Sequence, residues 1–279
     1  MAYTTLVDAA TVAAHLDDPA WVVVDTRHAL ADFGLGRRLY NQAHLPGAFF
    51  ADVESDLAGA HTGRNGRHPL PEPDVFAAFL RGAGVNDDTQ IVAYDAGGDM
   101  FAARLWFLCR WIGHGAVAVL NGGIAAWTAG GYPTTSQLPA PRSGTITAHV
   151  RPGLVVDAAY VRTHLGDPRV QLVDARAADR FAGENETVDP VAGHIPGARN
   201  RFFRENFEPD GRFKSPDDLA AAFRALGKAE AIVHQCGSGV SGAVNMLATE
   251  IAGLHGTRLY AGSWSEWIAD PTRPVATGS

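Results

Sequence analysis

The segment most able to do chemistry is a cysteine loop within residues 232–243. The apolar run Ile-Val-His-Gln ends at Cys236, three glycines follow within six residues, and an alanine-rich helical pattern begins at once. Such a strand, tight loop and helix start can surround the sulfur with backbone N–H groups and point a helix N-terminus at it. Both features stabilise the thiolate, which is the nucleophilic form of cysteine. We therefore expect Cys236 to act as a nucleophile.

The other cysteine has a different setting. Cys109 lies in the apolar helical stretch 101–111, which contains no glycine, so we expect it to pack as a small hydrophobic residue. Two cysteines in 279 residues, with no secretory signal at the N-terminus, predict a reduced cytoplasmic protein without disulfides. No apolar run is long enough to suggest a membrane helix. The formal charge of −7 argues against a nucleic-acid or anionic-membrane surface as partner.

The chain matches itself at five places in the same order, which indicates a duplicated domain. Each half, at about 130 residues, is large enough to bury its own core. We expect one domain over residues 1–136, a linker rich in proline and polar residues over 137–150, and a second domain over 151–279. The paired segments are 22–27 with 171–176, 43–48 with 193–198, 76–81 with 219–224, 91–95 with 232–236, and 122–127 with 262–267.

Each half alternates short β-branched runs with helix-like stretches rich in alanine, leucine and phenylalanine. The runs 21–24, 90–94 and 117–120 are examples. This alternation predicts an α/β fold in which each domain has a parallel sheet flanked by helices. Ligands of such sheets bind beyond the carboxyl ends of the strands, and Cys236 follows one of these ends.

Differences between the two halves point to function. Asp95 stands at the position that matches Cys236 and cannot attack as a thiolate, so we expect only the second domain to be catalytic. Arg180 faces Ala31 and is a candidate to bind a carboxylate or sulfonate of the substrate. Ser238 faces a glycine and could donate a hydrogen bond to a substrate oxygen. The positions that both halves keep are expected to be scaffold: Asp25 and Asp174, Arg27 and Arg176, His44 and His194, Trp127 and Trp267.

Three other motif interpretations of the loop fit less well. Gly237, Gly239 and Gly242 match a dinucleotide-binding fingerprint, but too few residues follow to complete such a sheet. A cysteine phosphatase would need an arginine six residues after the cysteine, where this chain has Gly242. A metal site is disfavoured because the eleven histidines are scattered and never accompany a second cysteine at ligand spacing.

Several segments resemble the two-domain rhodanese family of sulfurtransferases. The resemblance covers nearly the whole chain and rests on the segments 193–198, 236–241 and 262–267. It implies two tandem rhodanese-like domains, an inactive first and a catalytic second, with Cys236 opening a six-residue active-site loop. The loop is similar to the form Cys-Gly-Ser-Gly-Val-Thr of the 3-mercaptopyruvate branch of the family, with Ser241 in place of the threonine. Thiosulfate enzymes typically carry charged residues at its second and third positions.

The resemblance also implies roles for individual residues. Cys236 would carry a persulfide stabilised by the loop amides of Gly237, Gly239, Val240 and Ser241, with no metal or organic cofactor. Arg180 matches one of two family arginines that hold the mercaptopyruvate carboxylate, and Ser238 matches a serine proposed to assist donor activation together with a first-domain histidine and aspartate. We assign that histidine to His44 and that aspartate to Asp32. The second arginine has no counterpart in 182–191, so its candidate replacements are Arg64, Arg67, Arg201 and Arg204.

The sequence thus predicts a sulfurtransferase that moves sulfur from 3-mercaptopyruvate to a thiol or cyanide acceptor, with a reduced thioredoxin-like protein as a further possible acceptor. The first alternative is a thiosulfate:cyanide sulfurtransferase. The second is a rhodanese-like module in which Cys236 carries sulfur or oxidation state as a signal without turnover.

Overall fold

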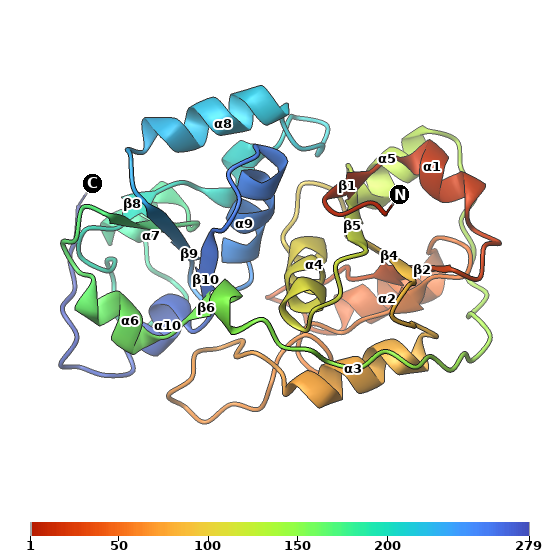
Figure 1. The fold of residues 1–279 in the computed structure, drawn as a ribbon, viewed down its shortest axis with the longest axis horizontal. Coiled ribbons are helices and arrows are strands. Elements are labelled where there is room, and N and C mark those ends of the chain that lie inside the picture. The colour runs from red at the N-terminus through yellow and green to blue at the C-terminus, as the bar shows by residue number, and fades with distance from the viewer. Residues whose placement is uncertain (1, 279) are drawn as a thin grey trace. The chain divides into compact units, whose positions relative to one another are not determined.

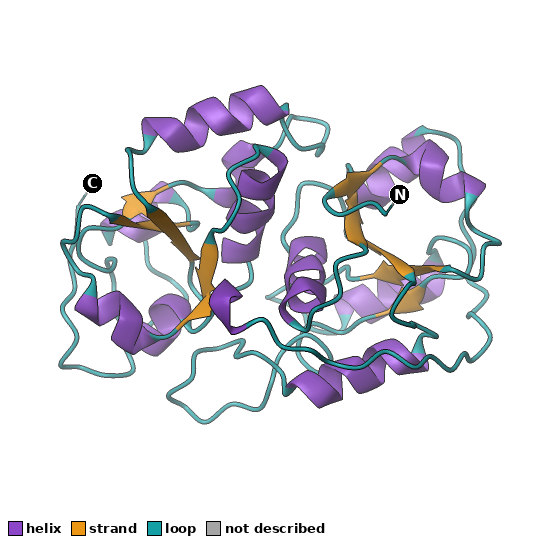
Figure 2. Cartoon of the chain, viewed as in Figure 1, coloured by secondary structure: helices purple, strands orange, loops and turns teal. Residues whose placement is uncertain are grey.

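A computed structural model describes residues 2–278 and contains two five-stranded sheets, one from each half of the chain (Figure 1). All strand pairs are parallel. The strand order is β1-β5-β4-β2-β3 in the first sheet and β6-β10-β9-β7-β8 in the second. Helices cover the faces of each sheet (Figure 2), so the predicted α/β fold with parallel sheets flanked by helices is confirmed.

The elements of the first half are β1 (Leu6–Val7), α1 (Ala9–Ala14), β2 (Trp21–Asp25), α2 (Leu35–Gln42), β3 (Phe49–Phe50), α3 (Pro73–Gly82), β4 (Gln90–Tyr94), α4 (Phe101–Trp111), β5 (Val117–Leu120) and α5 (Gly123–Ala129). Those of the second half are η1 (Pro152–Leu154), β6 (Val155–Val156), α6 (Ala158–Thr163), β7 (Val170–Asp174), α7 (Ala178–Ala182), β8 (Arg199–Asn200), η2 (Phe203–Asn206), α8 (Pro216–Ala225), β9 (Ala231–Gln235), α9 (Gly242–Ile251), β10 (Arg258–Tyr260) and α10 (Ser263–Trp267).

The two halves begin their first helices in the same way. Asp8 and Asp157 each lie just before a helix, and each side chain accepts a hydrogen bond of 2.7 Å from a backbone N–H three residues later. This N-cap satisfies one of the N–H groups that a helix start leaves without a partner. Among residues 2–278 no helix is long and apolar enough to cross a membrane.

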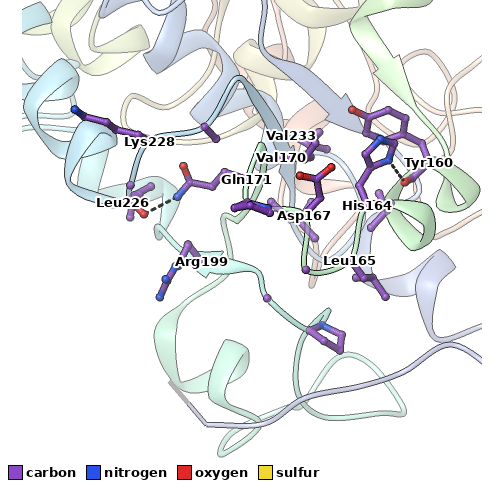
Figure 3. Close-up of a pocket in the computed structure, with 18 residues that line it drawn as sticks. Tyr160, His164, Leu165, Asp167, Val170, Gln171, Arg199, Leu226, Lys228 and Val233 are labelled. Atoms are coloured by element: carbon purple, nitrogen blue, oxygen red, sulfur yellow. Dashed lines mark hydrogen bonds between the residues drawn. The ribbon is translucent and has the colours of Figure 1, made fainter.

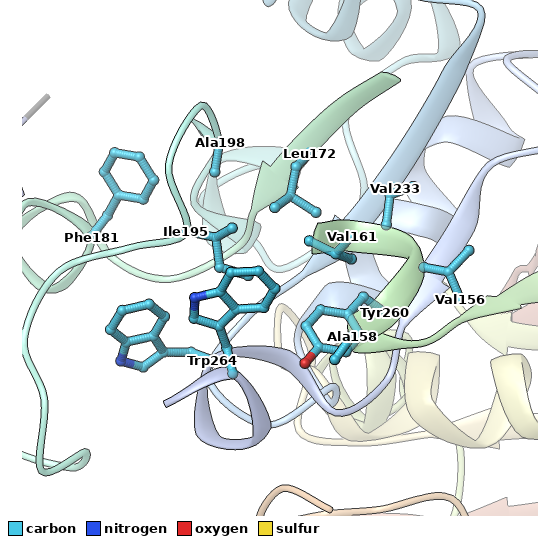
Figure 4. Packing of buried hydrophobic residues seen from close by; sticks show 11 residues of the cluster. Val156, Ala158, Val161, Leu172, Phe181, Ile195, Ala198, Val233, Tyr260 and Trp264 are labelled. Atoms are coloured by element: carbon cyan, nitrogen blue, oxygen red, sulfur yellow. The ribbon is translucent and has the colours of Figure 1, made fainter. Parts of the chain in front are cut away.

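Side chains of the second sheet alternate between two packed faces. Leu172 and Val233 are register partners that face a cluster containing the buried Trp264 and Trp267 of α10 (Figure 4). The next partners along the strands are Val173 and His234, and the His234 ring lies 5.9 Å from that of Phe223 in α8. Burial lowers the pKa of His234 to about 3, so this histidine is neutral and structural. Strands buried on both faces explain the continuous apolar runs.

In the first half, strand residues likewise pack against a buried tryptophan of a helix. Val92 and Ala118 belong to one buried cluster with Trp127 of α5. Cys109 lies in α4, is fully buried, and has its pKa raised far above the usual value by burial, so its thiol stays protonated. The packing role predicted for Cys109 agrees with this environment. The Trp127 and Trp267 indoles each donate to a backbone carbonyl, of Pro133 at 2.8 Å and Pro274 at 2.9 Å, as expected of paired scaffold residues.

Contacts divide the chain into two compact units, and each unit contains a short segment from the other half of the sequence. Residues 60–69 belong with the second unit, which otherwise comprises 152–206 and 214–279. Residues 207–213 belong with the first unit, together with 1–59 and 70–151. Self-comparison of the sequence does not predict this exchange. The domain boundaries inferred from the sequence remain a prediction.

The stretch 137–150, predicted as a linker, has no helix or strand but is held against the first unit. The backbone N–H of Gly144 donates to the Arg81 carbonyl at 2.8 Å, and that of Ile146 donates to the Val85 carbonyl at 3.1 Å. Ile146 is 1% exposed, so its side chain anchors the stretch.

The Asp95 loop of the first unit holds a carboxylate with its own backbone. Oδ1 of Asp95 accepts from the Gly97 N–H at 2.9 Å, and Oδ2 accepts from the Ala102 N–H at 3.1 Å. Burial raises the pKa of Asp95 to about 6, with a further contribution from the nearby Asp99, while the two amides oppose the shift.

We predict that the wild type loses stability as the pH rises through about 6 and that Asp95→Asn abolishes this loss. The pKa of Asp95 is about 6 in the folded chain, against the ordinary value of 3.8. The stabilisation from protonated Asp95 is therefore fully present below about pH 4 and is lost as the pH rises through about 6. The loss is on the order of 3 kcal/mol. Urea unfolding of both proteins between about pH 4 and 7.5 measures it, and parallel stability profiles would refute the assignment.

Candidate active site

Cys236 follows directly on β9, at the carboxyl end of a central strand of the second sheet. The residue is 2% exposed. Its backbone N–H donates to Ser263 Oγ at 3.1 Å, and its carbonyl accepts from the Trp264 N–H at 3.0 Å. Both polar backbone groups of Cys236 are therefore fixed by the first residues of α10.

The loop after Cys236 is shaped by Gly239. Its N–H donates to Cys236 Sγ at 3.0 Å. Its φ of +83° lies in the left-handed region, and an added Cβ would lie 2.1 Å from the Ala261 carbonyl oxygen, so only glycine fits. The amides of Gly237, Val240 and Ser241 have no protein partner among residues 2–278, although these residues are buried. Buried N–H groups of this kind can bind an anionic ligand by donating hydrogen bonds to it.

The side chain of Ser238 contacts a histidine. Its Oγ lies 2.8 Å from Nδ1 of His68, and the two residues are 7% and 6% exposed. His68 comes from the segment 60–69, which the sequence comparison between halves did not connect with the loop. The signal that could have found it is the histidine at the end of the polar run 63–68.

The two residues assigned to assist Ser238, His44 and Asp32, belong to the first unit and have partners there. The His44 ring nitrogens lie within hydrogen-bonding distance of two backbone carbonyls, of Tyr40 at 2.7 Å and Gln137 at 3.1 Å. Asp32 is exposed and forms an ion pair with Arg38. Within the second unit, Ser238 is contacted by His68, and the assisting roles of His44 and Asp32 stay predictions.

Arg180 lies beside the loop, held by carboxylates. Its Nε and Nη2 both donate to Glu186, with the shortest contact at 2.8 Å, and Nη2 also lies 3.1 Å from Asp189. Burial acts to raise the pKa of Glu186, but hydrogen bonds from Arg180 and from two backbone amides outweigh it and keep the pKa below its usual value. An added Cβ on Gly237 would lie 3.8 Å from Arg180 Nη2. The guanidinium is therefore fixed close to the loop.

The four candidate arginines have different environments. Arg67 lies at the loop, because an added Cβ on Gly237 would be 2.9 Å from its Nη2. Arg201 pairs with Glu205 at 2.9 Å, and the Arg204 guanidinium lies 5.7 Å from the Phe203 ring centre. Arg64 is exposed and lines a separate hollow of about 380 Å³ with Glu266 and Arg273.

Ser263 is a site residue that sequence reasoning missed. Its φ of 55° is unusual for a residue with a side chain, and it is fully buried. Its hydroxyl accepts from the Cys236 N–H and donates to the Tyr260 carbonyl at 2.9 Å. Ser263 therefore ties β10 to the start of the cysteine loop.

A separate pocket of about 290 Å³ lies in the second unit (Figure 3). Tyr160, His164, Gln171 and Lys228 are among the residues that line it, and the hydrogen bonds drawn join Gln171 to Leu226 and His164 to Tyr160. None of the predicted site residues lines this pocket. Residues 2–278 contain no cluster of three or more histidine, cysteine, aspartate or glutamate side chains that could hold a metal ion.

Comparison with known proteins defines the class of protein. A family model described as a rhodanese-like domain matches residues 8–130 and again 157–270. The chain therefore belongs to the rhodanese-like family, and it carries two such domains. The resemblance inferred from the sequence is confirmed.

Individual relatives are similar over nearly their whole length. The chain is 46% identical to a Pseudomonas aeruginosa protein named "Probable 3-mercaptopyruvate sulfurtransferase", with 100% of each chain covered. It is 33% identical to the thiosulfate sulfurtransferase of Cricetulus griseus, covering 94% of this chain and 88% of that one. The crystal structure of SseA from Escherichia coli superposes with a TM-score of 0.83 at 33% identity, covering 94% and 99%. The chain is thus a sulfurtransferase of the rhodanese-like family.

We predict that Gly239→Ala disrupts the loop more than Gly253→Ala disrupts its own site. Gly253 has a φ of +72° and free space around it, so alanine there should cost only about 1–2 kcal/mol of backbone strain. Alanine at Gly239 adds an overlap with the Ala261 carbonyl and should cost a further ~2 kcal/mol or more. Thermal unfolding of both variants checks this, and equal losses of stability would contradict the tight packing described.

Proposed function

We propose that the chain transfers sulfur from 3-mercaptopyruvate to a thiol or cyanide acceptor through a persulfide on Cys236. The observation that carries this proposal is the buried Cys236 thiol at the end of β9, with the Gly239 amide donating to Sγ. A donor fixed in advance stabilises negative charge on sulfur without reorganisation. The loop amides of Gly237, Val240 and Ser241 are proposed to stabilise the outer sulfur in the same way.

The reaction has two half-reactions. The Cys236 thiolate attacks the donor sulfur, an S–S bond forms and the C–S bond of 3-mercaptopyruvate breaks. The electron pair of that bond leaves with the carbon, which takes up a proton to give pyruvate. The acceptor then attacks the outer sulfur and releases the Cys236 thiolate. Covalent catalysis of this form produces ping-pong kinetics.

Arg180 and Ser238 are proposed to bind the donor. The Arg180 guanidinium lies beside Gly237 and suits a carboxylate, and the Ser238 hydroxyl can donate to a substrate oxygen while its own Oγ faces His68. The full-length relative at 46% identity and the uncharged loop both favour 3-mercaptopyruvate. Relatives named as thiosulfate sulfurtransferases favour the second candidate donor, whose S–S bond would break to release sulfite.

The second domain, residues 151–279, is proposed to be the catalytic one. Asp95 replaces the cysteine in the first domain, and a carboxylate cannot form a persulfide. We infer no metal or organic cofactor and no nucleic-acid or membrane partner. A reduced thioredoxin-like protein is the proposed macromolecular acceptor. Both cysteines are free thiols, which fits a reducing cytoplasm.

Steady-state sulfur release with 3-mercaptopyruvate and with thiosulfate tests the proposal. The wild type should turn over 3-mercaptopyruvate with the higher kcat/KM. Cys236→Ser should be inactive with both donors, and Cys109→Ser is the matched control that should keep activity within about twofold. The control separates the loss of the nucleophile from a general effect of removing a cysteine.

Three other results of this assay would change the proposal. A higher kcat/KM for thiosulfate would replace the proposed donor with the alternative. Sulfur loading of Cys236 without repeated release to cyanide or dithiothreitol would make the protein a sulfur or redox sensing module. No sulfur on Cys236 from either donor would refute the proposed function.

A further inference from the structure

Two guanidinium groups approach Gly237 from different parts of the chain. Arg180 comes from α7, and Arg67 comes from the segment 60–69 that packs within the second unit. An added Cβ on Gly237 would be 2.9 Å from Arg67 Nη2 and 3.8 Å from Arg180 Nη2. Arg67 is therefore at least as close to the cysteine loop as the arginine that the sequence identified.

Arg67 is fixed in this position by its backbone and its side chain. Its N–H donates to Ser265 Oγ at 3.0 Å. The preceding Gly66 has a φ of +82°, and an added Cβ there would lie 2.7 Å from the Gly262 carbonyl oxygen. The Arg67 Nη1 donates to the Asp189 carboxylate, whose side chain is only 1% exposed. The segment is thus anchored on α10 at one point and on a buried carboxylate at another.

The two arginines differ in the donors that they leave free. The Nε and Nη2 of Arg180 already donate hydrogen bonds to Glu186 and Asp189. The Arg67 Nη2, which faces Gly237, has no protein partner among residues 2–278, and the side chain is 32% exposed. Burial raises the pKa of Asp189, although the two neighbouring guanidiniums act to lower it.

We infer that Arg67 is the second arginine that binds the anionic end of the sulfur donor, with Arg67 Nη2 as the free N–H donor. The inference rests on the proposed function, and it extends that function to small donors with a carboxylate or sulfonate-like group. Asp189 is a positioning residue, because it contacts both guanidiniums and holds them side by side. A guanidinium presents its donors in a rigid fork, which suits such planar or trigonal anions.

The arginines beside the loop belong to a network in which positive and negative charges balance. Arg67, Arg176 and Arg180 are balanced by three carboxylates within the same network, those of Asp174, Glu186 and Asp189. An anion is therefore attracted chiefly by N–H groups that point to its binding position. Removing Arg67 both deletes such a donor and leaves the network with excess negative charge.

Alkylation of Cys236 by iodoacetate and by iodoacetamide tests this inference without sulfur transfer. The two reagents react by the same substitution, in which the thiolate displaces iodide, but only iodoacetate carries a carboxylate. Arg67→Ala should lower the ratio of the rate constant for iodoacetate to that for iodoacetamide about fivefold to tenfold. The matched control is Arg64→Ala, because Arg64 lies on the same segment, is exposed and lines a different hollow. Its ratio should stay within about twofold of the wild type.

Steady-state kinetics with the preferred donor gives the second readout. Arg67→Ala should raise the donor KM by about tenfold with a smaller change in kcat, and Arg67→Lys should restore less than half of the lost affinity, because lysine lacks the fork. Transfer from the preformed persulfide to cyanide should be unchanged. An alkylation ratio in Arg67→Ala equal to that of Arg64→Ala would overturn the role of Arg67, even if Cys236 transfers sulfur. A lowered ratio in a protein that accepts no sulfur would support the anion site and refute only the proposed function.

Discussion

The packing of the cysteine loop against residues 261–264 is the constraint on which the site depends. Gly239 lies so close to the Ala261 carbonyl that no side chain fits there, and both backbone polar groups of Cys236 are bound by residues at the start of α10. Trp264, whose backbone N–H donates to the Cys236 carbonyl, is itself fully buried in the core of the second unit. The position of the sulfur is thus set by the hydrophobic core, and the buried Ser263, with its left-handed φ, completes the connection.

The duplicated loop in the first unit shows what this backbone shape can hold. There the anion is the carboxylate of Asp95, bound by the amides of Gly97 and Ala102. Because α4 begins after this loop as α9 begins after the other, the two loops share one framework with different side chains. The first holds a built-in anion that cannot accept sulfur. The second holds a thiol, and its Gly237, Val240 and Ser241 amides, which have no protein partner among residues 2–278, are proposed to bind a charge that forms during reaction.

Local patterns made much of this structure predictable from the sequence. The strand, glycine loop and helix around Cys236 are contiguous, so their spacing alone placed Cys236 at the carboxyl edge of a sheet and made it the candidate nucleophile. The duplication separated scaffold tryptophans from candidate site residues, and the indoles of Trp127 and Trp267 make equivalent hydrogen bonds. The apolar stretch around Cys109 was equally clear, because it contains no glycine and nine of its eleven residues are apolar.

The parts that could not be predicted depend on tertiary contacts. His68 reaches Ser238 across 170 positions of sequence, and Arg67 reaches Asp189 across 122. Neither pairing has a periodicity or a motif that a single sequence displays, and the exchange of the segment 60–69 between units brings both about. His44 was assigned from its motif, and the contacts of its ring with the Tyr40 and Gln137 carbonyls likewise emerge only from the packed structure.

The most direct test of a persulfide on Cys236 is the intact mass of the protein after a single exposure to 3-mercaptopyruvate without any acceptor. The account predicts that the wild type gains the mass of one sulfur atom, that peptide mapping places it on Cys236, and that cyanide then removes it in one step with formation of thiocyanate. A wild-type protein whose mass is unchanged by 3-mercaptopyruvate and by thiosulfate, while its Cys236 still reacts with iodoacetamide, would contradict the account.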